Sequence, residues 1–146
     1  MLSNSCRYGI RAVIYIASRQ KASGKTGIKA ISEALELPTP YLAKILQQLA
    51  RHKILHSAKG PHGGFSMLRD PAKVTLLDII EIIDGSDFFR NCIIHDGNCS
   101  CIDKNILPCP IHDEYGALRS GLIELFKNRT IYDMAKKANE NSSVTI

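Results

Sequence analysis

Four of the five cysteines lie in one short stretch of the sequence, with two histidines beside them. These residues are Cys92, His95, Cys99, Cys101, Cys109 and His112. Thiolates gathered this closely suit an iron–sulfur cluster, zinc or copper(I), or act themselves as redox-sensitive thiols. Structural zinc typically uses close Cys-x2-4-Cys pairs, whereas here a single serine separates Cys99 from Cys101 and Cys92 stands apart. The residues therefore favour an iron–sulfur cluster and leave another metal or thiol chemistry open.

The segment that holds these cysteines has no helical or strand periodicity. Residues 86–110 form a long connection, and such connections in compact domains are usually functional or disordered. In a reducing cytosol, thiols serve as ligands or reactive groups more often than as disulfides, and five cysteines cannot all pair. We therefore expect a cysteine-rich binding loop over residues 86–110.

The charge of the chain is unevenly distributed. Residues 1–70 carry eleven Lys or Arg and three Asp or Glu, a net charge of +8, whereas residues 71–146 have a net charge of −3. A basic half predicts a polyanionic partner such as nucleic acid, with a general solubility bias as the alternative. The sequence has no apolar run of membrane-spanning length and no signal-peptide pattern. We therefore expect a cytoplasmic protein without a membrane segment.

The first half is predicted to contain a helix-turn-helix. Apolar residues at helical spacing predict helices over residues 5–19, 28–35 and 40 to about 52. The last of these follows a tight turn in which Thr39 is expected to cap the helix and Pro40 to take its first position. The third helix therefore follows two helices and a tight turn, which is the order of elements in a helix-turn-helix.

The third helix has a polar outward face. Its apolar residues leave Lys44, Gln47, Gln48 and Arg51 on the opposite side. Side chains of these types reach base edges and phosphates in the major groove, and a merely solvated face is the alternative. Thr39 and Tyr41, near the helix start, are expected to contact phosphates or base edges.

A basic hairpin is predicted directly after this helix. Residues 54–59 and 65–69 have the pattern of strands around a glycine-rich connection that contains His62. A hairpin in this place is the wing of a winged-helix domain, and its tip with Lys59 and His62 fits a minor groove. A glycine-rich phosphate cradle is the weaker alternative, because no G-K-[ST] motif follows.

A fourth helix completes a winged-helix DNA-binding domain over residues 1–85. It is predicted to start at Thr75, with Asp78 as its capping partner, and to stop at Gly85. The expected fold class is therefore mainly α with a small β-hairpin, a winged helix-turn-helix followed by a long C-terminal dimerisation helix.

The C-terminal part is predicted to form a dimer. The helix over residues 111–127 has a heptad seam, which consists of Ile111, Tyr115, Leu118, Leu122 and Leu125. A short seam suits a helix that packs on its twin, and a core helix of the same domain is the alternative. A last helix over residues 130–138 completes the dimerisation region 111–138, and residues 139–146 are expected to form a flexible tail.

Several motifs carry a resemblance to a known family. They are Arg7-Tyr8-Gly9-Ile10-Arg11-Ala12, Ile31-Ser32-Glu33, Pro40-Tyr41-Leu42-Ala43-Lys44-Ile45-Leu46, Lys59-Gly60-Pro61-His62-Gly63-Gly64 and Cys109-Pro110-Ile111-His112. With them the chain resembles, over residues 3–136, the Rrf2 family of bacterial winged-helix transcription regulators. This resemblance implies a homodimer that binds a palindromic operator in double-stranded DNA. In the cysteine-bearing branches it also implies an iron–sulfur cluster (2Fe-2S or 4Fe-4S) between the fourth helix and the dimer helix.

The resemblance also implies a ligand set. Cys92 matches the family's first cysteine, Cys109 its last, and His112 lies where cluster-assembly regulators have a histidine ligand. The middle ligand stays open, because Cys99 and Cys101 both lie where the family has one cysteine. The set is therefore three cysteines with His112, or four cysteines.

One departure from the family concerns its nitric-oxide sensors. Where some of them supply a carboxylate ligand from the partner subunit, this chain has Arg7, which cannot coordinate iron.

We expect a dimeric DNA-binding regulator that senses iron–sulfur, redox or nitric-oxide status through a cluster that oxygen can remove during purification. The alternative is a regulator without a cluster that senses through thiols, another metal or a protein partner. An enzyme is not expected, because the sequence has no glycine-rich cofactor loop and no carboxylate set with an orienting partner.

Overall fold

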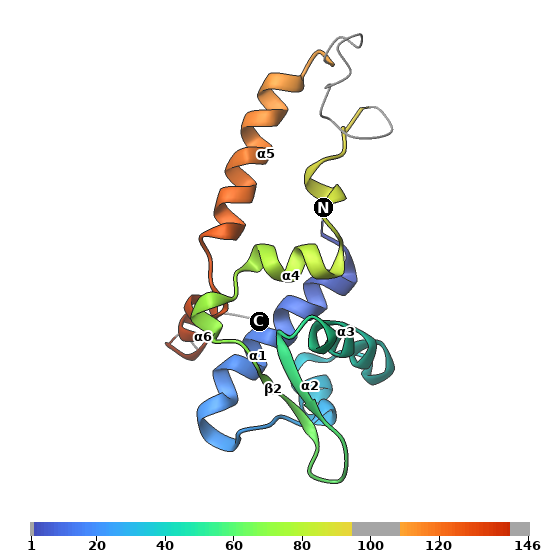
Figure 1. Cartoon of the computed structure of the whole chain (residues 1–146), viewed down its shortest axis with the longest axis vertical. Coiled ribbons are helices and arrows are strands. Elements are labelled where there is room, and N and C mark those ends of the chain that lie inside the picture. Colours follow the sequence, from blue (N-terminus) through green and yellow to red (C-terminus); the bar gives the residue numbers. More distant parts are fainter. Residues whose placement is uncertain (1, 95–108, 141–146) are drawn as a thin grey trace.

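The computed structural model describes residues 2–94 and 109–140, which form a mainly helical structure with one short hairpin that projects from it (Figure 1). The first half contains α1 (Asn4–Ser23), α2 (Ile28–Leu35), α3 (Thr39–Arg51), β1 (Leu55–Ala58) and β2 (Gly64–Met67). The second half contains the 3-10 turns η1 (Pro71–Lys73) and η2 (Asp87–Phe89) and the helices α4 (Leu76–Ile83), α5 (His112–Lys127) and α6 (Ile131–Glu140). The predicted fold class, mainly α with one small hairpin, is confirmed.

The helix α1 is the central element of the core. Its residues Ala12, Val13 and Ile16 are buried in a cluster to which α2, α3, α6 and the hairpin also contribute. Burial of this apolar surface is the main favourable term in folding. Gly9 allows α1 to approach α4 closely, because a Cβ atom at this position would lie 2.3 Å from Cδ1 of Ile83. Because residues of α1 and α3 belong to the same buried cluster, packing in this core fixes α3 beside α1.

The helices α2 and α3 form the predicted helix-turn-helix, with one difference at the turn. Glu36 ends α2 in the left-handed conformation, with a φ of 53°, and Pro38 is the N-cap residue of α3. The prediction that Thr39 caps α3 is therefore wrong, because Thr39 already lies inside the helix. Its hydroxyl oxygen lies 2.8 Å from Oγ of Ser32, so that Thr39 instead joins the two helices.

The strands β1 and β2 form the predicted antiparallel hairpin. Their register pairs Leu55 with Met67, and both side chains are buried against the helices. Both strands are shorter than the predicted ranges 54–59 and 65–69; β1 lies inside its range, whereas β2 begins one residue before its range, at Gly64. The hairpin follows α3 directly and extends away from the helices (Figure 1).

Two close backbone contacts fix the hairpin. Thr26, between α1 and α2, forms an isolated bridge to Phe65, with N–O distances of 2.8 and 2.9 Å. Gly63 closes the connection between the strands, and a Cβ atom there would lie 2.3 Å from the carbonyl oxygen of Ala58. A larger residue at this position would force the hairpin connection apart.

The start of α4 has the predicted reciprocal cap. The backbone N–H of Asp78 donates to Oγ1 of Thr75 at 3.1 Å, and the Asp78 carboxylate accepts the Thr75 N–H at 2.8 Å. This capping box satisfies donors that a helix start leaves without partners. The helix ends at Ile83, shortly before the predicted stop at Gly85.

The helix α5 extends away from the rest of the molecule (Figure 1). The predicted helices over residues 111–127 and 130–138 are confirmed, but α6 continues to Glu140, so residues 139 and 140 are helical and not part of a tail. The remaining tail, residues 141–146, lies outside the described residues, as do residues 95–108 of the predicted cysteine loop. Within the described part of the chain, no helix is both long and apolar enough to cross a membrane.

Candidate nucleic-acid interface and cysteine loop

The outward face of α3 carries three of the polar residues expected to contact DNA. Lys44, Gln47 and Arg51 are exposed, whereas the apolar face of the helix is buried in the core. Steps of three and four residues place these three side chains on one side of the helix. Within residues 2–94 and 109–140, no carboxylate forms an ion pair with Lys44 or Arg51. Their charges are therefore available to a polyanion.

The two expected contact residues at the start of α3 also bind neighbouring helices. Thr39 contacts Ser32 of α2, and the hydroxyl of Tyr41 is hydrogen-bonded to that of Ser5 in α1. The Tyr41 ring also packs edge-on against Tyr8, with 5.9 Å between the ring centroids. Because Tyr41 is still 42% exposed, it can contact a partner while α1 holds it in place.

Gln48 faces α4 and is half-buried. Its Nε2 atom donates a 2.6 Å hydrogen bond to the backbone carbonyl of Ile82. This carbonyl lies in the last turn of α4, where carbonyl groups have no partner within the helix. The structure thus gives Gln48 a part in packing α3 on α4, whereas Gln47 next to it remains on the outward face.

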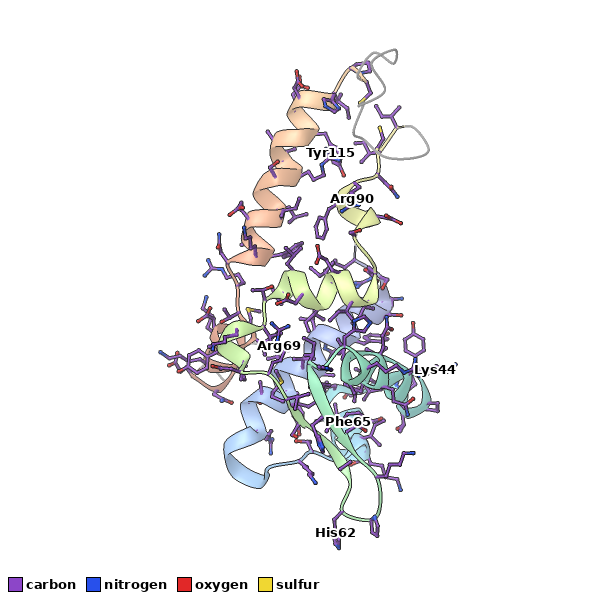
Figure 2. The ribbon with its side chains drawn as sticks, in the orientation of Figure 1. Lys44, His62, Phe65, Arg69, Arg90 and Tyr115 are labelled. Atoms are coloured by element: carbon purple, nitrogen blue, oxygen red, sulfur yellow. The ribbon has the colours of Figure 1, made fainter. Side chains whose placement is uncertain are left out.

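The hairpin places the predicted wing residues at its exposed end. Lys59 and His62 are both exposed, and Figure 2 shows His62 at the end of the hairpin and Lys44 on α3. Between α3 and β1 lies an open hollow of about 500 Å³, lined by Gln47 and Arg51 from the helix and Lys59 from the hairpin, among others. The polar face of α3 and the wing therefore border one continuous depression.

The structure describes the two ends of the cysteine loop, which lie toward the N-terminal end of α5 (Figure 1). Cys92 follows η2 and is half-buried, and Cys109 precedes α5 and is buried. The backbone N–H of His112 donates to the Cys109 carbonyl at 2.9 Å. The remaining predicted ligands, Cys99 and Cys101, lie outside the described residues together with His95. Among the described residues alone, no three His, Cys, Asp or Glu side chains form a group that could hold a metal ion.

The seam of α5 is largely exposed on the single chain. The exposed fractions are 37% at Ile111, 73% at Leu118, 37% at Leu122 and 48% at Leu125. A different stripe of α5, formed by Ile123 and Phe126, packs toward α4 and η2. These exposures do not support the alternative in which the seam belongs to the core of the same chain. The pairing of two copies stays a prediction.

The sequence did not predict the burial of Cys6. Cys6, near the start of α1, is fully buried in a second apolar cluster with Ile80 of α4 and Phe89 of η2. Burial, together with the nearby Asp84 carboxylate, raises the pKa of the Cys6 thiol to about 12. The thiol therefore stays protonated and is unsuited to bind a metal or to react as a nucleophile.

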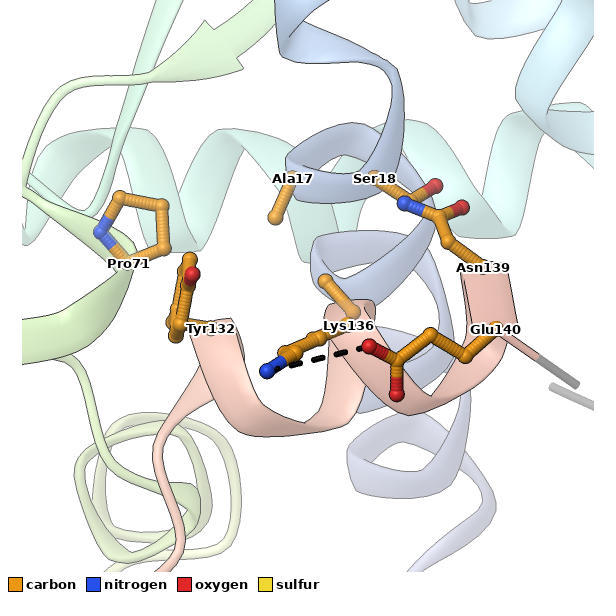
Figure 3. A pocket seen from close by; sticks show the side chains of 8 residues that line it. Ala17, Ser18, Pro71, Tyr132, Lys136, Asn139 and Glu140 are labelled. Atoms are coloured by element: carbon orange, nitrogen blue, oxygen red, sulfur yellow. Dashed lines mark ion pairs between the residues drawn. The ribbon is translucent and has the colours of Figure 1, made fainter.

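A second hollow of about 580 Å³ lies between α1, η1 and α6 (Figure 3). Ala17, Pro71 and Tyr132 line it, and Lys136 and Glu140 form an ion pair at its side, with 3.8 Å between Nζ and Oε1. None of the predicted DNA contacts or cysteine ligands lines this hollow. It takes no part in the candidate sites.

Comparison with known proteins identifies one family. The profile of the Rrf2 family, described as an iron-dependent transcriptional regulator, matches residues 2–137. A helix-turn-helix-type transcriptional regulator of Aquifex aeolicus is 32% identical to this chain over 134 residues, which cover 92% of this chain and 90% of that protein.

Two solved structures share the fold. CymR, the global cysteine regulator of B. subtilis, has a TM-score of 0.77 at 22% identity and covers 93% of this chain and 96% of its own. The IscR protein of T. potens has a TM-score of 0.72 at 22% identity and covers 100% of this chain and 93% of its own. The family consists of transcriptional regulators, which confirms the expectation of a regulator and not an enzyme.

Proposed function

Because the chain belongs to the Rrf2 family of transcriptional regulators, we propose that it binds a palindromic operator as a homodimer and responds to a loop-bound iron–sulfur cluster. The observation that carries the proposal is the shared surface of α3 and the hairpin. Lys44, Gln47 and Arg51 from the helix and Lys59 from the hairpin are exposed on it. Lysine and glutamine on such a helix reach base edges in the major groove, and a basic hairpin reaches the minor groove or the backbone. We place this activity in the cytoplasm.

The exposed seam of α5 supports the homodimer. Leu118 and Leu125 are large apolar side chains on a helix that already packs on its own chain through Ile123 and Phe126. A second copy would cover the seam symmetrically. Two copies would then present two α3 helices to successive major grooves, about 34 Å apart.

The chemistry of the loop ends supports the iron–sulfur cluster. Cys92 and Cys109 are soft sulfur donors at the two ends of one loop, and both are at least partly sheltered from water. Such donors fit iron–sulfur clusters, which are sensitive to oxidants and solvent access. Cys92 and Cys109 would hold the cluster, and His112 or the Cys99 and Cys101 pair would complete its ligands. When bound, the cluster supplies redox and nitric-oxide sensitivity.

The apolar cluster around Phe89 supports a path from the loop to the DNA. Phe89 lies three residues before Cys92 and packs in the apolar cluster that also contains Cys6, near the start of α1. One residue earlier in α1, Ser5 holds the Tyr41 hydroxyl on α3. A change in loop packing that moves Phe89 would therefore reach the start of α3 through the start of α1. In this switch, the spacing of the two α3 helices in the dimer changes with the state of the loop.

Anaerobic reconstitution with iron and sulfide tests the cluster. Wild-type protein is expected to bind both and to become brown, whereas Cys109→Ser is expected to stay colourless. Single substitutions of Cys99 or Cys101 should be partly compensated by the neighbouring cysteine, and the double substitution should not. The matched control is Cys6→Ala, which removes a cysteine outside the loop and should leave the iron content unchanged.

Equal iron content in wild type and Cys109→Ser would contradict the cluster. The chain would then be a DNA-binding regulator that senses through thiols, another metal or a protein partner.

A further inference from the structure

The hollow between α1, η1 and α6 has walls that the fold holds in place. The start of α6 is fixed to the segment after η1, because the backbone N–H of Ile131 donates to the Val74 carbonyl at 2.8 Å. Ala135, which lines the hollow from α6, is buried in the main core cluster. At η1, the Asp70 carboxylate accepts a backbone N–H of the turn at 2.9 Å. A hollow with such walls is already formed before a ligand binds, as small-molecule sites usually are.

The hollow has an apolar end and a polar end. In Figure 3, Pro71 and Tyr132 lie at one end, whereas Ser18 and Asn139 lie at the other, with Ala17 between them. Its volume of about 580 Å³ falls within the range of roughly 300–1,000 Å³ that is usual for small-molecule sites. The shape and lining therefore suit a small molecule with one apolar and one polar end.

Lys136 and Glu140 add one charge of each sign to the lining. They lie one turn apart on α6, which places both on the side of the hollow. Their Nζ and Oε1 atoms are 3.8 Å apart, which is longer than a hydrogen bond, and within the described residues neither forms another ion pair. The two groups therefore keep their hydrogen-bonding capacity for a ligand. A ligand that complements them carries a carboxylate for Lys136 and an ammonium group for Glu140.

The neutral polar groups fit the same pair of charges. The Ser18 hydroxyl donates to the Tyr15 carbonyl within α1 at 2.8 Å, so that its oxygen is left to accept. The Asn139 side-chain amide has both donors and an acceptor. An ammonium group needs acceptors and a carboxylate needs donors. The polar end of the hollow offers both kinds of group, as a ligand with opposite charges on adjacent atoms requires.

We propose that this hollow binds a free α-amino acid with a large apolar side chain. The α-carboxylate pairs with Lys136 and the α-ammonium group with Glu140, while Ser18 and Asn139 add hydrogen bonds. The apolar side chain lies against the Tyr132 ring, which is half-exposed without a ligand. The site is distinct from the proposed operator surface and from the cysteine loop, because no residue of either lines the hollow.

The test is isothermal titration calorimetry of the full-length protein at neutral pH with L-phenylalanine and L-leucine. At least one of them is expected to bind at one site per chain. Three analogues then remove one feature each: 3-phenylpropionate lacks the ammonium group, phenethylamine lacks the carboxylate, and glycine lacks the side chain. Each should bind about tenfold more weakly than the intact amino acid, because each loses one set of contacts.

Variants assign each charge of the ligand to its partner. Lys136→Gln should weaken the binding of the amino acid and leave that of phenethylamine unchanged, because phenethylamine has no carboxylate to lose. Glu140→Gln should weaken the binding of the amino acid and leave that of 3-phenylpropionate unchanged. Tyr132→Ala should weaken the binding of all three. The matched control is Lys137→Gln, at an exposed position of α6 that does not line the hollow, and it should bind as wild type does.

Thermal unfolding gives a second measurement. The amino acid should raise the unfolding midpoint of wild type, because a ligand of the folded state stabilises it, and should raise that of Lys136→Gln less. The proposal is overturned if neither amino acid binds, or if Lys136→Gln and Glu140→Gln bind as tightly as wild type. Binding of 3-phenylpropionate as tight as that of L-phenylalanine would overturn it in favour of a monocarboxylate. Since the measurements use the protein alone, such failure leaves the proposed operator and cluster unaffected.

Discussion

The winged-helix body, residues 2–85 together with α6, and the α5 arm, residues 86–94 and 109–127, differ in how they bury their apolar side chains. In the body, Ile31, Leu46 and Leu49 are completely buried, and the charged side chains lie outside. In the arm, Leu118 and Leu125 are exposed although they form a regular stripe. Contiguous exposed apolar surface in a regulator marks a site for a partner. The body buries its large apolar side chains within one chain, whereas the arm leaves part of its apolar surface exposed, as the proposed dimer requires.

The two regions meet at the apolar cluster around Cys6, Ile80 and Phe89. The start of α1 and the middle of α4 come from the body, whereas Phe89, Ile123 and Phe126 come from the arm. The backbone of Ser3, just before α1, also donates to Oδ2 of Asp84 at 2.9 Å, which fixes α1 to the end of α4. The two regions that we propose for DNA recognition and for sensing are therefore joined by one packed junction.

The largest expected effect comes from the seam. The double substitution Leu118→Asp and Leu122→Asp would place two unpaired charges where two apolar helices meet, so we expect the dimer to dissociate. Sedimentation velocity should give a monomer, and operator affinity should fall because two half-sites can no longer be bound together. The matched control is Ser120→Asp, an exposed position on the same helix outside the seam. A double variant that stays dimeric would show that the seam is not the dimer interface.

The junction between the two regions is expected to respond next. Phe89→Ala removes a ring that is 8% exposed and lies 6.1 Å from the Phe126 ring, so it should lower the free energy of unfolding by about 3 kcal/mol. Urea unfolding measures this loss. Ile94→Ala, at an exposed position of the same arm, serves as the control and should change stability little. If Phe89→Ala unfolds at the wild-type urea concentration, the ring does not join the arm to the body.

The body was more predictable from the sequence than the arm for a physical reason. Local signals define the body: helical spacing gave α2 with its observed bounds, glycines marked the hairpin, and Thr75 with Asp78 marked the start of α4. The seam was recognised as a pattern, but the pattern does not say whether the same chain or another covers it. The sequence also could not define the ligand set of the proposed cluster, because Cys99 and Cys101 lie close together and either could be the middle ligand.

Three residues have structural contacts that the sequence did not reveal. Gln48 and Gln47 are neighbours on one helix, and only the packing of α4 directs Gln48 to the carbonyl of Ile82. Thr39 had the residue type of a cap, but the turn places Pro38 there. Cys6 is buried by segments from three other parts of the chain. Spacing along one helix cannot reveal such contacts.

The difference between Gln47 and Gln48 gives a prediction of intermediate size. If Gln47 reads a base through two hydrogen bonds, Gln47→Ala should relax operator discrimination by about 1 to 3 kcal/mol without altering stability. Gln48→Ala should instead leave the Ile82 carbonyl without its partner and lower stability by about 1 kcal/mol. Competition binding with operator duplexes that carry single base-pair changes, together with thermal unfolding, measures both. Unchanged discrimination by Gln47→Ala would remove it from the base-reading residues.

The smallest expected effect concerns Lys59 in the wing. Its side chain is exposed and, within the described residues, pairs with no carboxylate, so we expect it to act on DNA through charge. Lys59→Ala should weaken binding to all duplex sequences alike and reduce the magnitude of the salt slope by about one unit, because one fewer phosphate is neutralised. Titrations of operator and unrelated duplexes over the same salt series measure this. Lys53→Ala removes an exposed lysine between α3 and β1 that does not line the hollow beside Lys59, and it is the matched control. A loss confined to the operator would show that Lys59 reads sequence, and the division between a reading helix and a charge-binding wing would then be wrong.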